Sequence, residues 1–278
     1  RLGGARLGGG EGPEALFAAL ANSMLQAQPP YLREFLLASS TLRRLTPELC
    51  ANALGLSGAS EWLIETQIRN LFLSKAPDGL FYHTLFRNFL QTQLKKNSPE
   101  LYHDLHVRAA RWFEETGDLE EAFEHYMDAD LTEQAAALSD RVAASFFSQG
   151  KTESLIRWRD ELKEAAVSAP RLVYVCALIH TDRYEYDLAE SELDLAEQGF
   201  EEQQDRDGLI DVRLQRAMLN LQRGQYRKAG EQASAVLEHI PGPTSQRGRA
   251  LKVLGMAHLR QGDAEVAIHY LEEAVPLH

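Results

Sequence analysis

Nine histidines and several carboxylate pairs are the side chains here that could bind a metal ion or move protons. His103 and His106 share a helix face at i, i+3, but no third ligand of a suitable type recurs near them. His258 and His269 fall in two neighbouring predicted helices, and pairs such as Glu114-Glu115 are typical of solvated helix faces. No serine, histidine and acid arrangement accompanies them. The sequence therefore predicts neither a catalytic nor a metal site in this segment, and no enzyme.

A second chemical motif is Gly150-Lys151-Thr152, which matches the end of a phosphate-binding loop. The full motif requires glycine five residues before Gly150, where this chain has Ser145 within a predicted helix. No strand precedes the motif either. We interpret it as a turn between two helices.

Composition excludes several function classes. The formal charge is -12, from 41 acidic and 29 basic residues, which argues against this segment holding a nucleic acid by itself. Cys50 and Cys176 lie far apart and outside any CxxC pair, so a reducing cytoplasm is the simplest setting. No apolar run approaches the ~20 residues of a membrane helix, and the sequence predicts no membrane contact.

Residues 1–13 are rich in glycine and lack a hydrophobic period, which predicts a flexible linker. The chain opens on Arg1 rather than Met and stops directly after a complete helix pair, so we expect a fragment of a longer protein.

Residues 14–97 combine short helices with one predicted hairpin. A linker helix covers 14–28 and ends at Pro29-Pro30, and a second helix begins at Tyr31. Thr46-Pro47 opens a third helix that ends at Gly55, and Ser60 caps a fourth. Strands at 71–73 and 80–82 are joined by Ala76-Pro77-Asp78-Gly79, and a helix follows around 85–94. This order of elements predicts a small winged-helix domain.

Residues 98–278 repeat a helix hairpin. The predicted turn positions 117, 150, 184, 224 and 262 are separated by 33, 34, 40 and 38 residues, close to the period of about 34 of tetratricopeptide repeats. A small residue or leucine follows each turn by five positions, as Ala267 follows Gly262. Small residues also recur before the turns, at Ala110, Ala143, Ala177, Ala217 and Gly255. The fold class is therefore mostly α, with an α-solenoid of TPR-like hairpins behind the winged helix.

Residues 14–130 resemble a known family, the MalT-like signal-transducing NTPases of the STAND class. The resemblance rests on Leu32-Arg33-Glu34-Phe35-Leu36-Leu37, on Tyr82-His83-Thr84-Leu85-Phe86-Arg87-Asn88-Phe89-Leu90 and on Ala109-Ala110-Arg111-Trp112-Phe113. Gly117-Asp118-Leu119-Glu120-Glu121-Ala122 with His125 completes it. The later repeats resemble the family only in type.

The resemblance implies an upstream nucleotide-binding domain, ATP or ADP in the full-length protein and ATP-dependent self-association. It also implies that His83 contacts the phosphate of bound ADP and helps to hold a closed, inactive form. An imidazole at the end of a rigid strand can donate a hydrogen bond to a phosphate oxygen. The alternative is a histidine that caps the following helix or packs under the wing. This segment lacks the Walker motifs, so it holds no cofactor itself.

The first helix of each hairpin should supply the inner face of the solenoid, where a small-molecule inducer, a partner protein or a peptide would bind. In repeat register this face exposes eight residues: Arg171, Tyr174, Asp211, Leu214, Met218, Arg249, Lys252 and Met256. Ordinary solvated surface is an equal alternative for them. The expected function is the sensor arm of a STAND-type transcriptional regulator; the alternative is a TPR scaffold without nucleotide coupling.

Overall fold

The computed structural model describes residues 13–240 and 242–277, so the predicted linker of residues 1–13 lies almost entirely outside the described residues. Two compact units, Arg1–Leu131 and Thr132–His278, make up the chain. Within the described residues, no helix combines the length and the apolar character that a membrane span requires.

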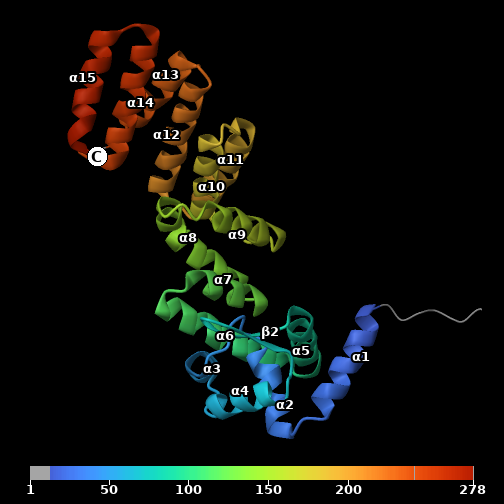
Figure 1. Cartoon of the computed structure of the whole chain (residues 1–278). Coiled ribbons are helices and arrows are strands. Elements are labelled where there is room, and N and C mark those ends of the chain that lie inside the picture. The colour runs from blue at the N-terminus through green and yellow to red at the C-terminus, as the bar shows by residue number, and fades with distance from the viewer. Residues whose placement is uncertain (1–12, 241, 278) are drawn as a thin grey trace, which may run out of the picture. The chain divides into compact units, whose positions relative to one another are not determined.

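The first unit contains seven helices and one hairpin among its described residues (Figure 1). In chain order these are α1 (Pro13–Gln26), α2 (Pro30–Ser39), α3 (Pro47–Leu54), α4 (Ala59–Ile68), β1 (Leu73–Ala76), β2 (Gly79–Tyr82), α5 (Thr84–Asn97), α6 (Pro99–Thr116) and α7 (Leu119–Asp128).

The predicted ends of α3 are confirmed. The Thr46 side chain accepts a hydrogen bond from the Leu49 amide at 3.1 Å, Pro47 occupies the first turn, and Gly55 ends the helix with φ 76°. The predicted cap of α4 is wrong. Gly58 rather than Ser60 occupies the N-cap, and the Trp62 indole lies where a side chain on residue 58 would project, so this position requires glycine.

The predicted hairpin forms, but its first strand begins two residues later than expected. Asn70 and Phe72 have positive φ angles of 53° and 51°, so the chain turns there before β1 starts at Leu73. Pro77 and Asp78 make the turn, and Leu45 extends the antiparallel pairing through mutual backbone hydrogen bonds with Leu80. The helices and this wing are the elements of a winged-helix domain.

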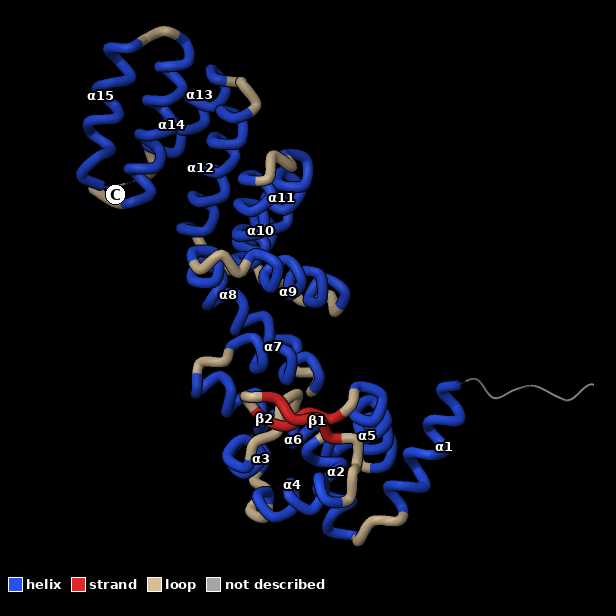
Figure 2. The backbone as a smooth tube through the Cα atoms, in the orientation of Figure 1, coloured by secondary structure: helices blue, strands red, loops and turns tan. Residues whose placement is uncertain are grey.

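The second unit contains eight helices among its described residues, followed by a short 3₁₀ turn (Figure 2). In chain order these are α8 (Thr132–Ser148), α9 (Thr152–Glu164), α10 (Pro170–Asp182), α11 (Tyr186–Glu202), α12 (Arg206–Gln222), α13 (Tyr226–Leu237), α14 (Ser245–Gln261), α15 (Ala264–Ala274) and η1 (Val275–Leu277). Successive helices pair into hairpins that stack on one another.

All five predicted turn positions adopt the left-handed conformation that ends a helix. The glycines at 117, 150, 224 and 262 have φ between 75° and 96°, and Tyr184 has φ 62°. The small residues also allow paired helices to approach closely, as their spacing predicts. A Cβ on Gly255 would lie 2.6 Å from Leu271 Cγ, so only glycine allows α14 and α15 this close.

The first helix pair of the predicted repeats, α6 and α7, lies in the first compact unit. Helix α6 packs against α3 and α5 of the winged helix, and α7 packs on α6. The first hairpin is thus part of the same body as the winged helix.

Candidate functional site

Three of the predicted ligand-binding residues meet in one hydrogen-bonded cluster. Arg249 of α14 donates from Nη1 to Asp211 Oδ1 of α12 at 2.7 Å and from Nη2 to the Tyr174 hydroxyl of α10 at 2.8 Å. The three helices are the first helices of successive hairpins. The predicted register therefore does bring these side chains onto one surface, which we call the first-helix face.

The cluster is partly shielded from water. The Arg249 and Asp211 side chains are 34% and 19% exposed, so both still reach the solvent. Burial raises the pKa of the Tyr174 phenol, and the nearby charge of Arg249 only partly counteracts this rise. The phenol therefore stays protonated and can donate as well as accept a hydrogen bond.

Gln246 is a member of the cluster that the sequence analysis missed. Its amide donates to the Asp207 carbonyl at 3.0 Å and to Asp211 Oδ1 at 3.2 Å. Gln246 precedes Arg249 by three positions on α14, so helical spacing alone could have placed both on one face.

Four other predicted ligand-binding residues differ in how far they are buried and in what they contact. Arg171 pairs with Asp205 at 2.6 Å and lies over the Phe200 ring, and Lys252 is exposed. Met218 and Met256 are half-buried over the apolar cluster around Ala217 and Leu254.

The prediction that Leu214 is exposed is wrong. Its side chain keeps 1% of its exposure and packs with Val236, Ile240 and Ala250. Leu214 lies on the flank of α12 that α13 and α14 cover, so a residue three positions from Asp211 is already turned into the core.

His83 occupies the junction between β2 and α5. Its amide donates to the Phe72 carbonyl at 2.8 Å, and its own carbonyl accepts from the Phe86 amide at 2.9 Å. The imidazole is exposed and makes no capping hydrogen bond at α5. The backbone is therefore fixed at both sides while the ring remains accessible.

Two further histidines form a buried pair between α6 and α7. His106 and His125 keep 0% and 3% exposure, and their Nδ1 atoms lie 3.0 Å apart. Burial, together with the charge of Arg87, lowers the pKa of His106 to about 3, and burial also lowers the pKa of His125. Both rings are therefore neutral at pH 7.

The surroundings of this pair indicate its tautomers. One Nδ1 must donate to the other, and His106 Nε2 is buried without a partner among the described residues. A proton on that Nε2 would have no acceptor, so we assign the His106 proton to Nδ1. His125 then carries its proton on Nε2, which faces Glu121 at 4.0 Å.

The phosphate-loop-like turn at Gly150 and the two cysteines are parts of the helical framework. Gly150 forms the left-handed turn after α8, and Lys151 Nζ lies 4.5 Å above the Phe146 ring. Cys50 and Cys176 are both buried, and burial raises the pKa of each thiol to about 12. Within the described ranges, no group of three or more His, Cys, Asp or Glu residues is arranged to hold a metal ion.

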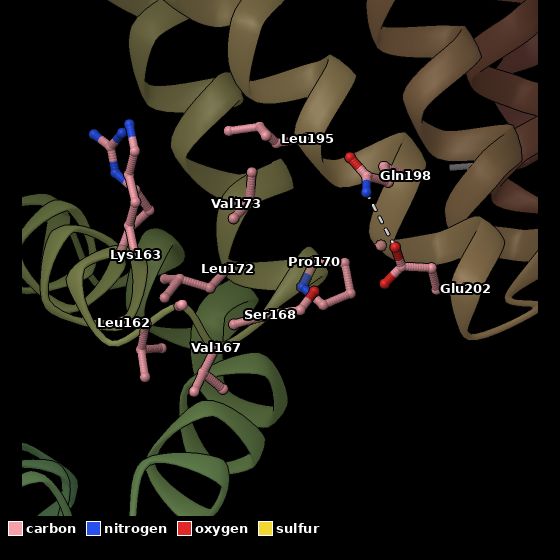
Figure 3. Close-up of a pocket in the computed structure, with 14 residues that line it drawn as sticks. Leu162, Lys163, Val167, Ser168, Pro170, Leu172, Val173, Leu195, Gln198 and Glu202 are labelled. Atoms are coloured by element: carbon pink, nitrogen blue, oxygen red, sulfur yellow. Dashed lines mark hydrogen bonds between the residues drawn. The ribbon is translucent and has the colours of Figure 1, made fainter.

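The second unit also contains a cavity of about 250 Å³ (Figure 3). It lies between the C-terminal half of α9, the loop 165–169, the start of α10 and the C-terminal half of α11. None of the eight predicted residues lines it. Its lining is mostly apolar, with Lys163 on one side and Gln198 and Glu202 on the other.

Comparison with known proteins agrees with this architecture. Residues 21–102 match the model of the MalT winged helix domain, and residues 209–278 match a tetratricopeptide repeat model. The serine/threonine-protein kinase PknK of Mycobacterium tuberculosis (strain ATCC 25618 / H37Rv) is 31% identical over 140 residues. That match covers 49% of this chain and 13% of PknK, and the same holds for PknK of Mycobacterium bovis.

Two solved structures align with parts of this chain at low sequence identity. A STAND protein with a tetratricopeptide repeat sensor from Pyrococcus horikoshii aligns with TM-score 0.48 and 15% identity, covering 94% of this chain and 46% of that chain. The TPR protein YrrB aligns with TM-score 0.47 and 19% identity, covering 67% and 91%. With both family models matched in the predicted order, the chain carries a MalT-like winged helix domain followed by tetratricopeptide repeats.

Proposed function

We propose that this chain is the sensor arm of a STAND-type, ATP-dependent regulator. The repeats bind a small inducer, a peptide or a partner protein, and the winged helix passes this event to an upstream nucleotide-binding domain. The observation that carries the proposal is the order of the two matched models, with a MalT-like winged helix before the repeats. ATP or ADP would be held by the upstream domain.

The packing of the first unit supports transmission through the winged helix. Arg43, in the segment between α2 and α3, forms ion pairs with Glu121 and Glu124 of α7 at 3.5 Å and 3.1 Å. Arg87 of α5 donates to the Ser40 carbonyl at 3.0 Å and so fixes the same segment. A displacement of α7 would therefore act directly on the winged helix.

The position of His83 supports its proposed contact with ADP. The strand end and the start of α5 hold its backbone, while its exposed ring is free to meet a phosphate on another domain. Such a contact would stabilise a closed state, and ligand binding to the repeats would have to favour the open state by several kcal/mol to switch most molecules.

The ligand on the first-helix face would be polar. Exposed Lys252 offers positive charge, and the Tyr174 hydroxyl, which accepts from Arg249, offers a polar group on the same surface. Transcription is the output that the family resemblance implies. A kinase output is the second candidate, because the curated relatives are named as protein kinases and the chain spans only 13% of their length.

Release of fluorescent mant-ADP from the full-length gene product tests the proposal. His83→Ala should release mant-ADP faster than wild type by roughly tenfold, the worth of one charge-assisted hydrogen bond. His269→Ala, an exposed histidine on α15, is the matched control and should release it at the wild-type rate. Equal rates for all three proteins would remove the proposed contact, and failure to bind mant-ADP would favour the scaffold alternative.

A further inference from the structure

The cavity of the second unit is built from elements that approach one another closely. A Cβ on Gly199 would lie 2.8 Å from Pro170 Cβ, so α11 approaches the start of α10 at a distance that only glycine permits. Val167 and Val173 supply half-buried apolar walls, together with Leu195, whose side chain is 44% exposed. A solvent-facing leucine in a concave apolar wall indicates a surface suited to an apolar ligand body.

Charge is separated across this cavity. Lys163 lies on the α9 side, and Glu202 lies on the α11 side with one carboxylate oxygen accepting from Gln198 at 3.1 Å (Figure 3). Among the described residues, Lys163 makes no ion pair within 4.0 Å. Arg159, which also lines the cavity, is already paired with Glu192 and Asp160. Lys163 is thus the cation left for a ligand.

The start of α10 does not compete with Lys163 for an anion. Asp140 of α8 accepts a hydrogen bond from the Leu172 amide at 2.9 Å and so occupies this helix N-terminus. Burial raises the pKa of Asp140 to about 6, although hydrogen bonds from two backbone amides oppose the shift. Lys163 on α9 is therefore the group in this cavity that can bind an anion.

We propose that this cavity binds a small zwitterion whose carboxylate and ammonium groups are separated by an apolar body. The carboxylate would pair with Lys163, the ammonium with Glu202, and the body would lie against Val167, Val173 and Leu195. A cavity of about 250 Å³ suits one six-membered ring with two short charged ends, since ~150 Å³ already holds benzene. This site is separate from the first-helix face and goes beyond the proposed function.

NMR titration of the ¹⁵N-labelled chain with 4-(aminomethyl)benzoate tests the proposal. The probe should shift amide signals around Lys163, Val173 and Glu202. Benzoate and benzylamine, which each carry one of the two charges, should bind roughly tenfold more weakly. A probe that shifts no cavity signal, or that binds no better than its two halves, would overturn the proposal.

Charge exchange between the two sides makes the test sharper. Lys163→Glu and Glu202→Lys should each weaken binding by roughly tenfold, whereas the double variant should regain it because the probe can bind turned end to end. Leu195→Glu should also weaken binding, and Leu188→Glu, on the exposed part of the same helix, should not. Equal affinity of wild type and both single charge variants would contradict the site.

Discussion

Arg249 Nη2 donates a hydrogen bond to the Tyr174 hydroxyl at 2.8 Å, although the two residues are 75 positions apart in the sequence. The contact joins α14 to α10, while Asp211 ties the same guanidinium to α12. One side chain therefore links the first helices of three successive hairpins. A ligand that engages Arg249 would compete with this link and could change how the hairpins pack.

Removing only the hydroxyl tests how much this link contributes. Tyr174→Phe keeps the ring and should lower the free energy of unfolding by about 1 kcal/mol, since the lost hydrogen bond involves a charged group that is still one-third exposed. Tyr184→Phe is the control, because that residue is 76% exposed and should change stability by less than about 0.5 kcal/mol. Urea unfolding measures both, and equal stabilities would show that the link contributes nothing.

The turn at Tyr184 predicts a stabilising substitution. Tyr184 has φ 62°, a conformation that costs a non-glycine residue about 1 kcal/mol, and the other four turn positions are glycines. Tyr184→Gly should therefore raise the free energy of unfolding by about 0.5 kcal/mol. Gly224→Ala should lower it by about 1 kcal/mol without a steric clash, because the nearest atom to a new Cβ lies 3.8 Å away. A loss of stability in Tyr184→Gly together with a gain in Gly224→Ala would contradict the backbone explanation.

Two helical glycines provide a comparison of packing with helix propensity. Gly255→Ala places a Cβ 2.6 Å from Leu271 and 3.1 Å from the Ala267 carbonyl, and should destabilise the second unit by about 1–3 kcal/mol. Gly230→Ala places its Cβ 3.6 Å from Ala257, an ordinary contact, and should stabilise α13 by about 0.5–1 kcal/mol. Thermal unfolding of the two variants checks this, and destabilisation by both would show that the room at residue 230 is insufficient.

The buried histidine pair predicts that the first unit loses stability in mild acid. Because His106 and His125 have lowered pKa values, the unfolded chain binds two more protons than the folded unit once the pH falls below ~6.5. The free energy of unfolding should then fall with a slope that approaches about 2.7 kcal/mol per pH unit well below pH ~6.5, and it is retained well above that pH. Amide exchange of α6 and α7 between pH 7 and pH 5.5 measures this loss.

A double variant isolates the contribution of the two imidazoles. His106→Leu/His125→Leu keeps Arg43, Arg87, Lys95, His103, Glu121, Glu124 and Asp128 around the site, so their titration is common to both proteins. Burial raises the pKa of Asp128 and of Glu121, which acts in the opposite direction on acidification. The double variant should show a smaller loss of protection than wild type. The same loss in both would exclude the histidine pair as the cause.

The features that could be predicted from the sequence are those that depend on local geometry. The hairpin turns, the small residues between paired helices and the Thr46-Pro47 helix start follow from backbone conformation and side-chain size, and all were confirmed. The start of β1 was missed because two residues with positive φ interrupt an apolar run that reads as a strand.

The site was predictable only in part, because side-chain environment depends on neighbouring helices. Repeat register placed Tyr174, Asp211 and Arg249 on one surface. It could not show that α13 and α14 cover Leu214, or that Gln246 completes the cluster. The cavity beside Lys163 combines residues from three helices and a loop, and no short sequence pattern indicates it.

The central claim is that the bound nucleotide and the repeats are coupled. Hydrogen exchange in the full-length gene product tests this coupling, and the ligand need not be known. Linkage is reciprocal, so a ligand site on the repeats that controls the nucleotide-binding domain must itself respond to the bound nucleotide. We predict that amides of α10, α12 and α14 around Tyr174, Asp211 and Arg249 exchange at different rates with ADP and with a non-hydrolysable ATP analogue. Identical exchange in the two nucleotide states would contradict the sensor arm and support a scaffold.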